Sequence, residues 1–118
     1  MRLHHVNIPV PPGRGEMIAT FYCEVLGFSR IPRPENGSEG VWLSIGDGAQ
    51  LHLSEREGSN QPQTHFAVSV GDLDAVRVRL AQIGAEYQPS DDVFGTGGRG
   101  FTRDPAGNRI ELIAGSLD

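Results

Sequence analysis

The chain has 118 residues, a formal net charge of −5 and a sequence pI near 5.3, which suits one domain and disfavours nucleic acid or an anionic membrane as a partner. No apolar run reaches the roughly 18 residues that a membrane span needs, and the opening segment MRLHHVNIPV lacks the apolar core of a signal peptide. A single cysteine, Cys23, excludes an internal disulfide, so we expect a cytoplasmic protein with a buried, reduced thiol.

The chain opens with an alternating segment, LHHVNIPV over residues 3–10, which predicts a half-buried strand. Its apolar side chains take one face, so His5 and Asn7 share the less apolar one. A helix is predicted next over Met17–Leu26, because apolar residues recur there at helical spacing and Gly27 suits the C-terminal stop.

The second half of the chain begins in the same way. The segment QTHFAVSV, residues 63–70, alternates as a strand and places His65 on the less apolar face. Apolar residues then recur at helical spacing over residues 73–83. Asp72 suits the N-cap of this helix, and Gly84 suits its C-terminal stop.

Three strands are expected after each helix. They lie near residues 28–33, 41–45 and 50–54 in the first half, and near residues 86–88, 99–103 and 109–114 in the second. Asp47-Gly48 predicts a tight hairpin between the last two strands of the first half. At the corresponding point of the second half, Asp-Pro-Ala-Gly at 104–107 predicts a type I turn.

Four residues occupy matching points of the two halves. Aligning the opening strands places His5 against His65, and aligning GAQLHL with GNRIEL places His52 against Glu111. The separation is 47 residues from His5 to His52 and 46 residues from His65 to Glu111. All four lie on the less apolar faces of their predicted strands. Imidazoles and carboxylates gathered in this way indicate a site for a divalent metal ion.

Each half therefore reads as one βαβββ module, and the modules span about residues 1–57 and 63–115. The predicted fold is a single α+β domain of two tandem modules. We expect them to form a curved, cup-like mixed sheet with the helices on the outer side.

The segments FYCEVLGF (21–28) and RDPAGNRIELI (103–113), together with the histidine-bearing strands, resemble the vicinal oxygen chelate superfamily over essentially the whole chain. This superfamily includes glyoxalase I, extradiol dioxygenases and the bleomycin-binding resistance proteins. The resemblance implies metal ligands at His5, His52, His65 and Glu111. One position departs from the glyoxalase I pattern, in which a glutamate or glutamine stands where this chain has His52.

The function implied by the resemblance is that of a glyoxalase-like lyase or isomerase. Such an enzyme uses a divalent ion (Fe, Ni, Zn, Co or Mn) to bind two adjacent oxygens of a small molecule and to stabilise an oxyanion. Glu111 is the expected general base. His52 is the alternative acid/base group, because an imidazole titrates near neutral pH.

Two alternatives remain open. The first is a non-haem Fe(II) extradiol-type dioxygenase, in which His5, His65 and Glu111 form a triad of two histidines and one carboxylate. The second is a metal-free binding or resistance protein. Fosfomycin-modifying transferases share the His, His and Glu positions, but the sequence offers no convincing match to their phosphonate-binding residues.

The weaker candidates for substrate contacts share the predicted inner face or its rim; they are Asn7, Trp42, Gln50, Ser69, Arg99 and Phe101. The expected partners are a small-molecule substrate and a second copy of the chain in a homodimer. The ligands of one metal are expected to come from one chain or from both chains of that dimer.

Overall fold

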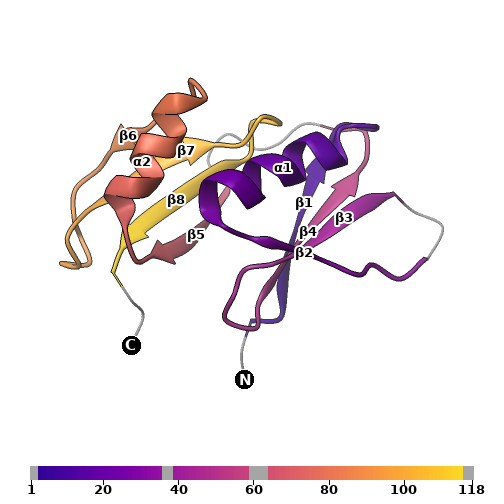
Figure 1. Ribbon diagram of the computed structural model, residues 1–118, viewed down its shortest axis with the longest axis horizontal. Coiled ribbons are helices and arrows are strands. Elements are labelled where there is room, and N and C mark those ends of the chain that lie inside the picture. Colours follow the sequence, from indigo (N-terminus) through magenta and orange to yellow (C-terminus); the bar gives the residue numbers. More distant parts are fainter. Residues whose placement is uncertain (1–2, 36–38, 59–63, 116–118) are drawn as a thin grey trace. The chain divides into compact units, whose positions relative to one another are not determined.

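The computed structural model describes residues 3–35, 39–58 and 64–115. The chain divides into two compact units, residues 1–60 and 61–118. Each unit has one four-stranded sheet and one helix (Figure 1). Residues 1, 2 and 63, which the expected module boundaries include, lie outside the described residues.

Both units follow the order βαβββ. The first contains β1 (His5–Val10), α1 (Gly15–Leu26), β2 (Ser29–Ile31), β3 (Gly40–Ser44) and β4 (Gln50–Glu55). The second contains β5 (His65–Val70), α2 (Leu73–Gln82), β6 (Gln88–Pro89), β7 (Arg99–Arg103) and β8 (Arg109–Ala114). The predicted α+β class and the tandem βαβββ modules are confirmed.

The two sheets have the same topology. The strand order is β1-β4-β3-β2 in the first unit and β5-β8-β7-β6 in the second. In each, the opening strand pairs in parallel with the last strand, and the other pairs are antiparallel. Each sheet is therefore mixed, and its last strand is central. Because side chains alternate along a strand, this pairing sets the residues of the opening and last strands beside one another on one face.

The apolar face of each sheet packs against the helix of its unit. Leu51 and Leu53 of β4 are no more than 1% exposed, and Tyr22 of α1 is fully buried with them. In the second unit Leu112 of β8 and Leu80 of α2 are fully buried. The histidine-bearing positions have the opposite parity. We call this opposite side of each sheet its histidine face.

The predicted end of the first helix and the predicted start of the second helix are confirmed. Gly27 follows α1 in the left-handed conformation with φ 75°, and the backbone N–H of Ala75 donates to Asp72 at the start of α2. The second helix ends at Gln82, one residue before the expected end, with Ile83 as its C-cap, and Gly84 follows in the left-handed conformation with φ 71°, as its role as a stop predicts.

Four further expectations need correction. The second strand is shorter than residues 28–33, because Pro32 and Pro34 lack the N–H groups that would extend it. The sixth strand covers Gln88–Pro89 instead of residues 86–88, because the carbonyl of Glu86 accepts a hydrogen bond from the Thr102 hydroxyl and not from a neighbouring strand.

The loop at Asp47-Gly48 is longer than a two-residue hairpin, since it closes through a hydrogen bond from Ile45 N–H to the Ala49 carbonyl. Cys23 is half-buried instead of buried, with the Arg30 guanidinium 3.4 Å from its sulfur.

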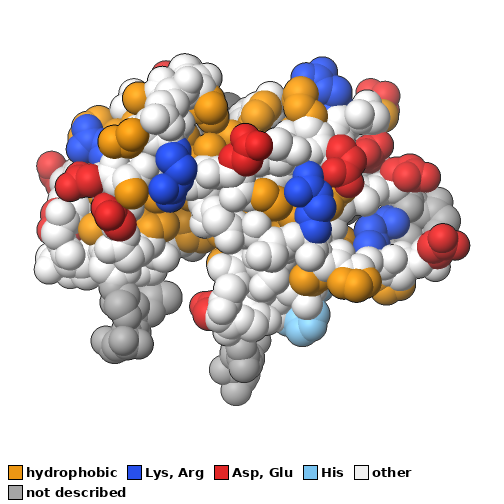
Figure 2. Space-filling model, in the orientation of Figure 1, with side chains coloured by type: hydrophobic (Ala, Val, Ile, Leu, Met, Phe, Trp, Pro, Cys, Tyr) orange, Lys and Arg blue, Asp and Glu red, His pale blue; other side chains and the backbone are white. Residues whose placement is uncertain are grey.

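No helix among the described residues is long and apolar enough to cross a membrane. In the view of Figure 2, acidic and basic side chains are interspersed over the described residues of each unit. The described residues on that face form no large patch of only acidic or only basic side chains.

Candidate functional site

The histidine face of the first sheet is built from β1, β4 and β3. Residues directly opposite each other on paired strands lie side by side, and the register sets His5 against Gln50 and Asn7 against His52. On the other side of β4, His52 is opposite Trp42. Three predicted substrate candidates and two predicted ligands therefore share one small area.

Ring stacking fixes the orientation of His52. Its imidazole lies between the ring of His5, at a centroid distance of 4.1 Å and an angle of 15°, and the ring of Trp42, at 3.8 Å and 1°. His52 Nε2 lies 2.8 Å from Gln50 Oε1, and His5 Nδ1 lies 2.9 Å from His4 Nδ1. The first unit thus brings its two predicted ligands together as a stack, with one nitrogen of His52 already bonded.

His52 is held in the neutral form. Burial, followed by the positive charges of His5, His4 and Arg33, lowers the pKa of His52 from 6.5 to about 4. A neutral imidazole is the form that donates a lone pair to a metal ion.

The lowered pKa predicts a dependence of stability on pH. The unfolded chain binds a proton at His52 more tightly than the folded chain, so stability falls as the pH falls from 6.5 towards 4. A shift of this size corresponds to at most about 3 kcal/mol in the free energy of unfolding. Urea unfolding of metal-free protein at pH 6.5 and at pH 4 checks this. The loss over this range is expected to shrink in His52→Gln, and an equal loss in both proteins would contradict the assignment.

The histidine face of the second sheet carries an ionic cluster. The register sets His65 against Arg109 and places Glu111 between Ala67 and Phe101. His65 Nε2 lies 3.0 Å from Glu111 Oε1, and Arg99 Nε donates to Glu111 Oε2 at 2.6 Å. The Glu111 side chain is 7% exposed and that of Arg99 is 17% exposed. Both carboxylate oxygens of Glu111 therefore have a partner within the unit.

Arg99 and His65, the hydrogen-bond partners of Glu111, lower the pKa of its carboxyl group. Burial alone would raise the pKa of Glu111, but the hydrogen bond and charge of Arg99, together with those of His65, hold that pKa below its ordinary value. Glu111 is thus ionised at neutral pH, as a metal-binding carboxylate must be.

Arg99 also connects Glu111 to the segment before β7. Its Nη1 donates to Ser90 Oγ at 2.9 Å and to the Asp91 carbonyl at 3.2 Å. The Asp92 carboxylate organises this segment by accepting the N–H groups of Thr96 and Gly97.

The geometry of the second unit fits one metal ion held by two of the predicted ligands. In octahedral coordination, two donor atoms bound at right angles, each about 2.1 Å from an ion, lie about 3.0 Å apart. His65 Nε2 and Glu111 Oε1 are 3.0 Å apart, which is also the length of their direct hydrogen bond, so an ion could take both atoms with little movement of either side chain. Among the described residues there is no group of three or more His, Cys, Asp or Glu side chains that could hold a metal within one cluster. The four predicted ligands are therefore seen as two pairs, one in each unit.

Other predicted substrate candidates are engaged within their own sheets. Ser54 Oγ donates to Asn7 Oδ1 at 2.5 Å, and Ser69 Oγ donates to the Gly115 carbonyl. Phe101 packs edge-on against His65 at 5.6 Å. Arg103 was missed by the sequence reasoning, although its spacing of two residues from Phe101 places it on the same face.

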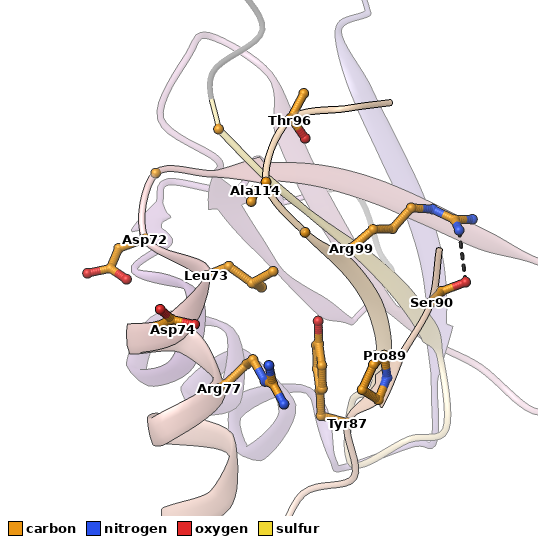
Figure 3. Close-up of a pocket in the computed structure, with 14 residues that line it drawn as sticks. Asp72, Leu73, Asp74, Arg77, Tyr87, Pro89, Ser90, Thr96, Arg99 and Ala114 are labelled. Atoms are coloured by element: carbon orange, nitrogen blue, oxygen red, sulfur yellow. Dashed lines mark hydrogen bonds between the residues drawn. The ribbon is translucent and has the colours of Figure 1, made fainter. Parts of the chain in front are cut away.

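A hollow lies elsewhere in the second unit, between α2 and the strand edges (Figure 3). Its volume is about 490 Å³, and Leu73, Tyr87 and Ala114 line its apolar part. Ala114 has the parity of the buried residues of β8, so the hollow belongs to the helix side of the sheet. Arg99 also lines this hollow, and Figure 3 shows its guanidinium extending to Ser90, another lining residue. Arg99 therefore contacts both the hollow and Glu111 of the His65–Glu111 pair, although His65 and Glu111 do not line the hollow.

Comparison with known protein families gives a match that covers nearly the whole chain. The model of the Glyoxalase/Bleomycin resistance protein/Dioxygenase superfamily matches residues 2–112. A search of curated proteins finds no match.

Solved structures share the fold. A protein from Bacillus anthracis assigned to the glyoxalase family is 28% identical, with a TM-score of 0.85 over 98% of this chain and 96% of the other. A variant of the fosfomycin resistance protein FosX from Listeria monocytogenes, in complex with Mn(II) and 1S,2S-dihydroxypropylphosphonic acid, is 19% identical, with a TM-score of 0.82 over 98% and 93%. TnmS3, an antibiotic binding protein from Streptomyces sp. CB03234, is 23% identical, with a TM-score of 0.74 over 98% and 97%. The chain belongs to the Glyoxalase/Bleomycin resistance protein/Dioxygenase superfamily.

Proposed function

We propose that this protein is a divalent-metal-dependent enzyme of glyoxalase type, a lyase or isomerase, with His5, His52, His65 and Glu111 as metal ligands. The observation that carries the proposal is that His65 and Glu111 meet on one face of the second sheet, with His65 Nε2 3.0 Å from Glu111 Oε1, so one ion could take both as ligands. The His5–His52 pair occupies the equivalent positions of the other sheet and adds two imidazoles. The FosX relative, which was solved with Mn(II), supports Mn(II) as one candidate ion.

A bound divalent ion would supply Lewis-acid stabilisation of an oxyanion on a small molecule with two adjacent oxygens. The residues of this chain would accept the substrate proton and orient the groups that bind the ion. Glu111 is ionised and can accept a proton from the substrate carbon, while Arg99 holds its carboxylate in place through Oε2. Trp42 would orient His52 by stacking and exclude water from one face of its ring.

One observation favours an Fe(II) dioxygenase as a second candidate. His52 Nε2 is already 2.8 Å from Gln50 Oε1, and the ring is stacked on both sides. His52 is thus the least available of the three histidines, which leaves the triad of His5, His65 and Glu111. A metal-free binding protein remains the third candidate, supported by the Arg99 guanidinium that already neutralises Glu111 and by the likeness to TnmS3.

Elemental analysis of protein purified without an affinity tag, beside His52→Ala, separates these functions. About one Mn, Ni, Zn or Co per chain, lost in the variant, is the result expected for the four-ligand enzyme. About one Fe per chain, retained in the variant, would overturn it in favour of the dioxygenase. No metal even after reconstitution would overturn both and leave a binding protein.

Arg99→Gln is expected to tighten metal binding by about tenfold or more. The guanidinium lies 2.6 Å from Glu111 Oε2, so it opposes a second cation at the same carboxylate. Competition with a fluorescent metal chelator measures the change. Arg30→Gln is the matched control, because it removes the same charge from the exposed pair with Glu16. Weaker binding in Arg99→Gln would instead mean that Arg99 is needed to position Glu111.

We also propose a homodimer working in the cytoplasm. The exposed apolar side chains of Val78 and Ile83, at 56% and 54%, support an interface near α2. The single half-buried Cys23 supports a reducing compartment. Light scattering measures the mass directly, and a monomer at working concentration would contradict the first part.

A further inference from the structure

The histidine face of the second sheet is unusually rich in arginine. The strand register places nine residues in three rows across β5, β8 and β7: His65, Arg109 and Arg103; Ala67, Glu111 and Phe101; and Ser69, Ile113 and Arg99. Three of these nine side chains are guanidinium groups and one is a carboxylate. The formal charge of this small area is therefore positive, although the whole chain carries −5.

The equivalent face of the first sheet has no such charge. Its three rows across β1, β4 and β3 are His5, Gln50 and Ser44; Asn7, His52 and Trp42; and Pro9, Ser54 and Gly40. None of these nine residues is an Asp, Glu, Lys or Arg. The two modules share one topology, so this difference in charge comes from the side chains and not from the fold.

The guanidinium groups gather around one aromatic ring. The Arg109 guanidinium carbon lies 3.9 Å from the centroid of Phe101, and that of Arg99 lies 5.0 Å from it. Arg109 Nη1 is also 3.5 Å from His65 Nδ1. A small hollow of about 40 Å³ beside Phe101 is lined by Arg103 and Arg109 together with Glu86, Gln88 and Thr102. Even with Glu86 counted, the cations outnumber the carboxylates here.

From this arrangement we infer that the second module binds the anionic end of the substrate, a carboxylate or a similar oxyanion, through Arg109 beside Phe101. The inference rests on the proposed function, because it names the substrate class of the same site. Planar guanidinium donors match the oxygens of a carboxylate, and their partial burial strengthens the attraction. A divalent ion at His65 and Glu111 would add more positive charge to this face, so an anionic substrate group would balance it.

Benzoate and its neutral counterpart benzamide test this inference in metal-free protein. Both probes have the same size and one aromatic ring, so the comparison isolates the charge of the carboxylate. Binding is followed by amide chemical-shift changes of residues 65–70, 99–103 and 109–114. We expect benzoate to bind at least about tenfold more tightly than benzamide, and this preference to fall with added salt.

Two arginine variants show whether Arg109 causes the preference for benzoate. Arg109→Gln is expected to remove the preference for benzoate and to leave benzamide binding unchanged. Arg14→Gln removes the same charge at the N-cap of α1 in the first unit and is expected to keep the preference. Equal affinities for the two probes, or an equal loss in Arg14→Gln, would overturn the inference. Because the protein is metal-free, this result is independent of the metal analysis, and failure of either proposal is recognised separately.

Discussion

Glu111→Gln is expected to weaken the binding of a divalent metal ion by at least about a hundredfold, or about 2.7 kcal/mol. The substitution keeps the size of the side chain but removes the only carboxylate among the four proposed ligands. It also leaves the Arg99 guanidinium, 17% exposed, beside a neutral group, so the remaining charge there opposes a cation. Isothermal titration of metal-free protein measures the affinity.

Glu16→Gln is the matched control for this substitution. It makes the same change of charge in an exposed ion pair, in which Glu16 lies 3.1 Å from Arg30, and it is expected to leave metal affinity unchanged. Unfolding in urea shows whether the Glu111 variant is folded. An unchanged affinity in a folded Glu111→Gln protein would exclude Glu111 as a ligand.

Asp104→Ala is expected to lower the free energy of unfolding by about 3 kcal/mol. The Asp104 carboxylate is 4% exposed and accepts three hydrogen bonds, from Ala106 N, Asn108 N and Asn108 Nδ2, at 2.8, 2.9 and 2.7 Å. These bonds hold the turn between β7 and β8, in which Gly107 N–H also donates to the Asp104 carbonyl. Without the carboxylate, the donors of the buried Asn108 lose their acceptor.

The corresponding turn of the first module supplies the control. Asp47 Oδ1 accepts an exposed hydrogen bond from Ala49 N at 3.1 Å, so Asp47→Ala is expected to cost less than about 1 kcal/mol. Chemical denaturation of both variants gives the comparison. Equal losses would mean that the Asp104 network adds nothing beyond an ordinary loop contact.

The sequence predicted the elements that a local pattern determines. Alternation gave the bounds of β7 and β8 without error, and Gly27 marked the end of α1. The errors arose where a distant side chain competes with the local pattern. The Thr102 hydroxyl bonds to the Glu86 carbonyl, and no signal near residue 86 reveals a partner sixteen residues away.

In the candidate site, too, the local pattern predicted some features, and others depend on contacts between distant residues. The repeat and the alternation predicted that His5 and His52, and likewise His65 and Glu111, lie on one face of each sheet, and the register places each pair together. The bond from Arg99 to Glu111 was not predicted, because it depends on how a long side chain turns across the neighbouring strand. The stacking of Trp42 on His52 could have been inferred only from the exact register of β3 and β4.

The measurement that tests the metal site most directly is a Co(II) titration of metal-free protein followed by visible absorption, which reports the ligands of the bound ion. We predict saturation at about one Co(II) per chain, with a spectrum of nitrogen and oxygen ligation that is lost in His5→Ala and in Glu111→Gln. Absorption that never saturates, or a saturating spectrum that both variants retain, would contradict the account.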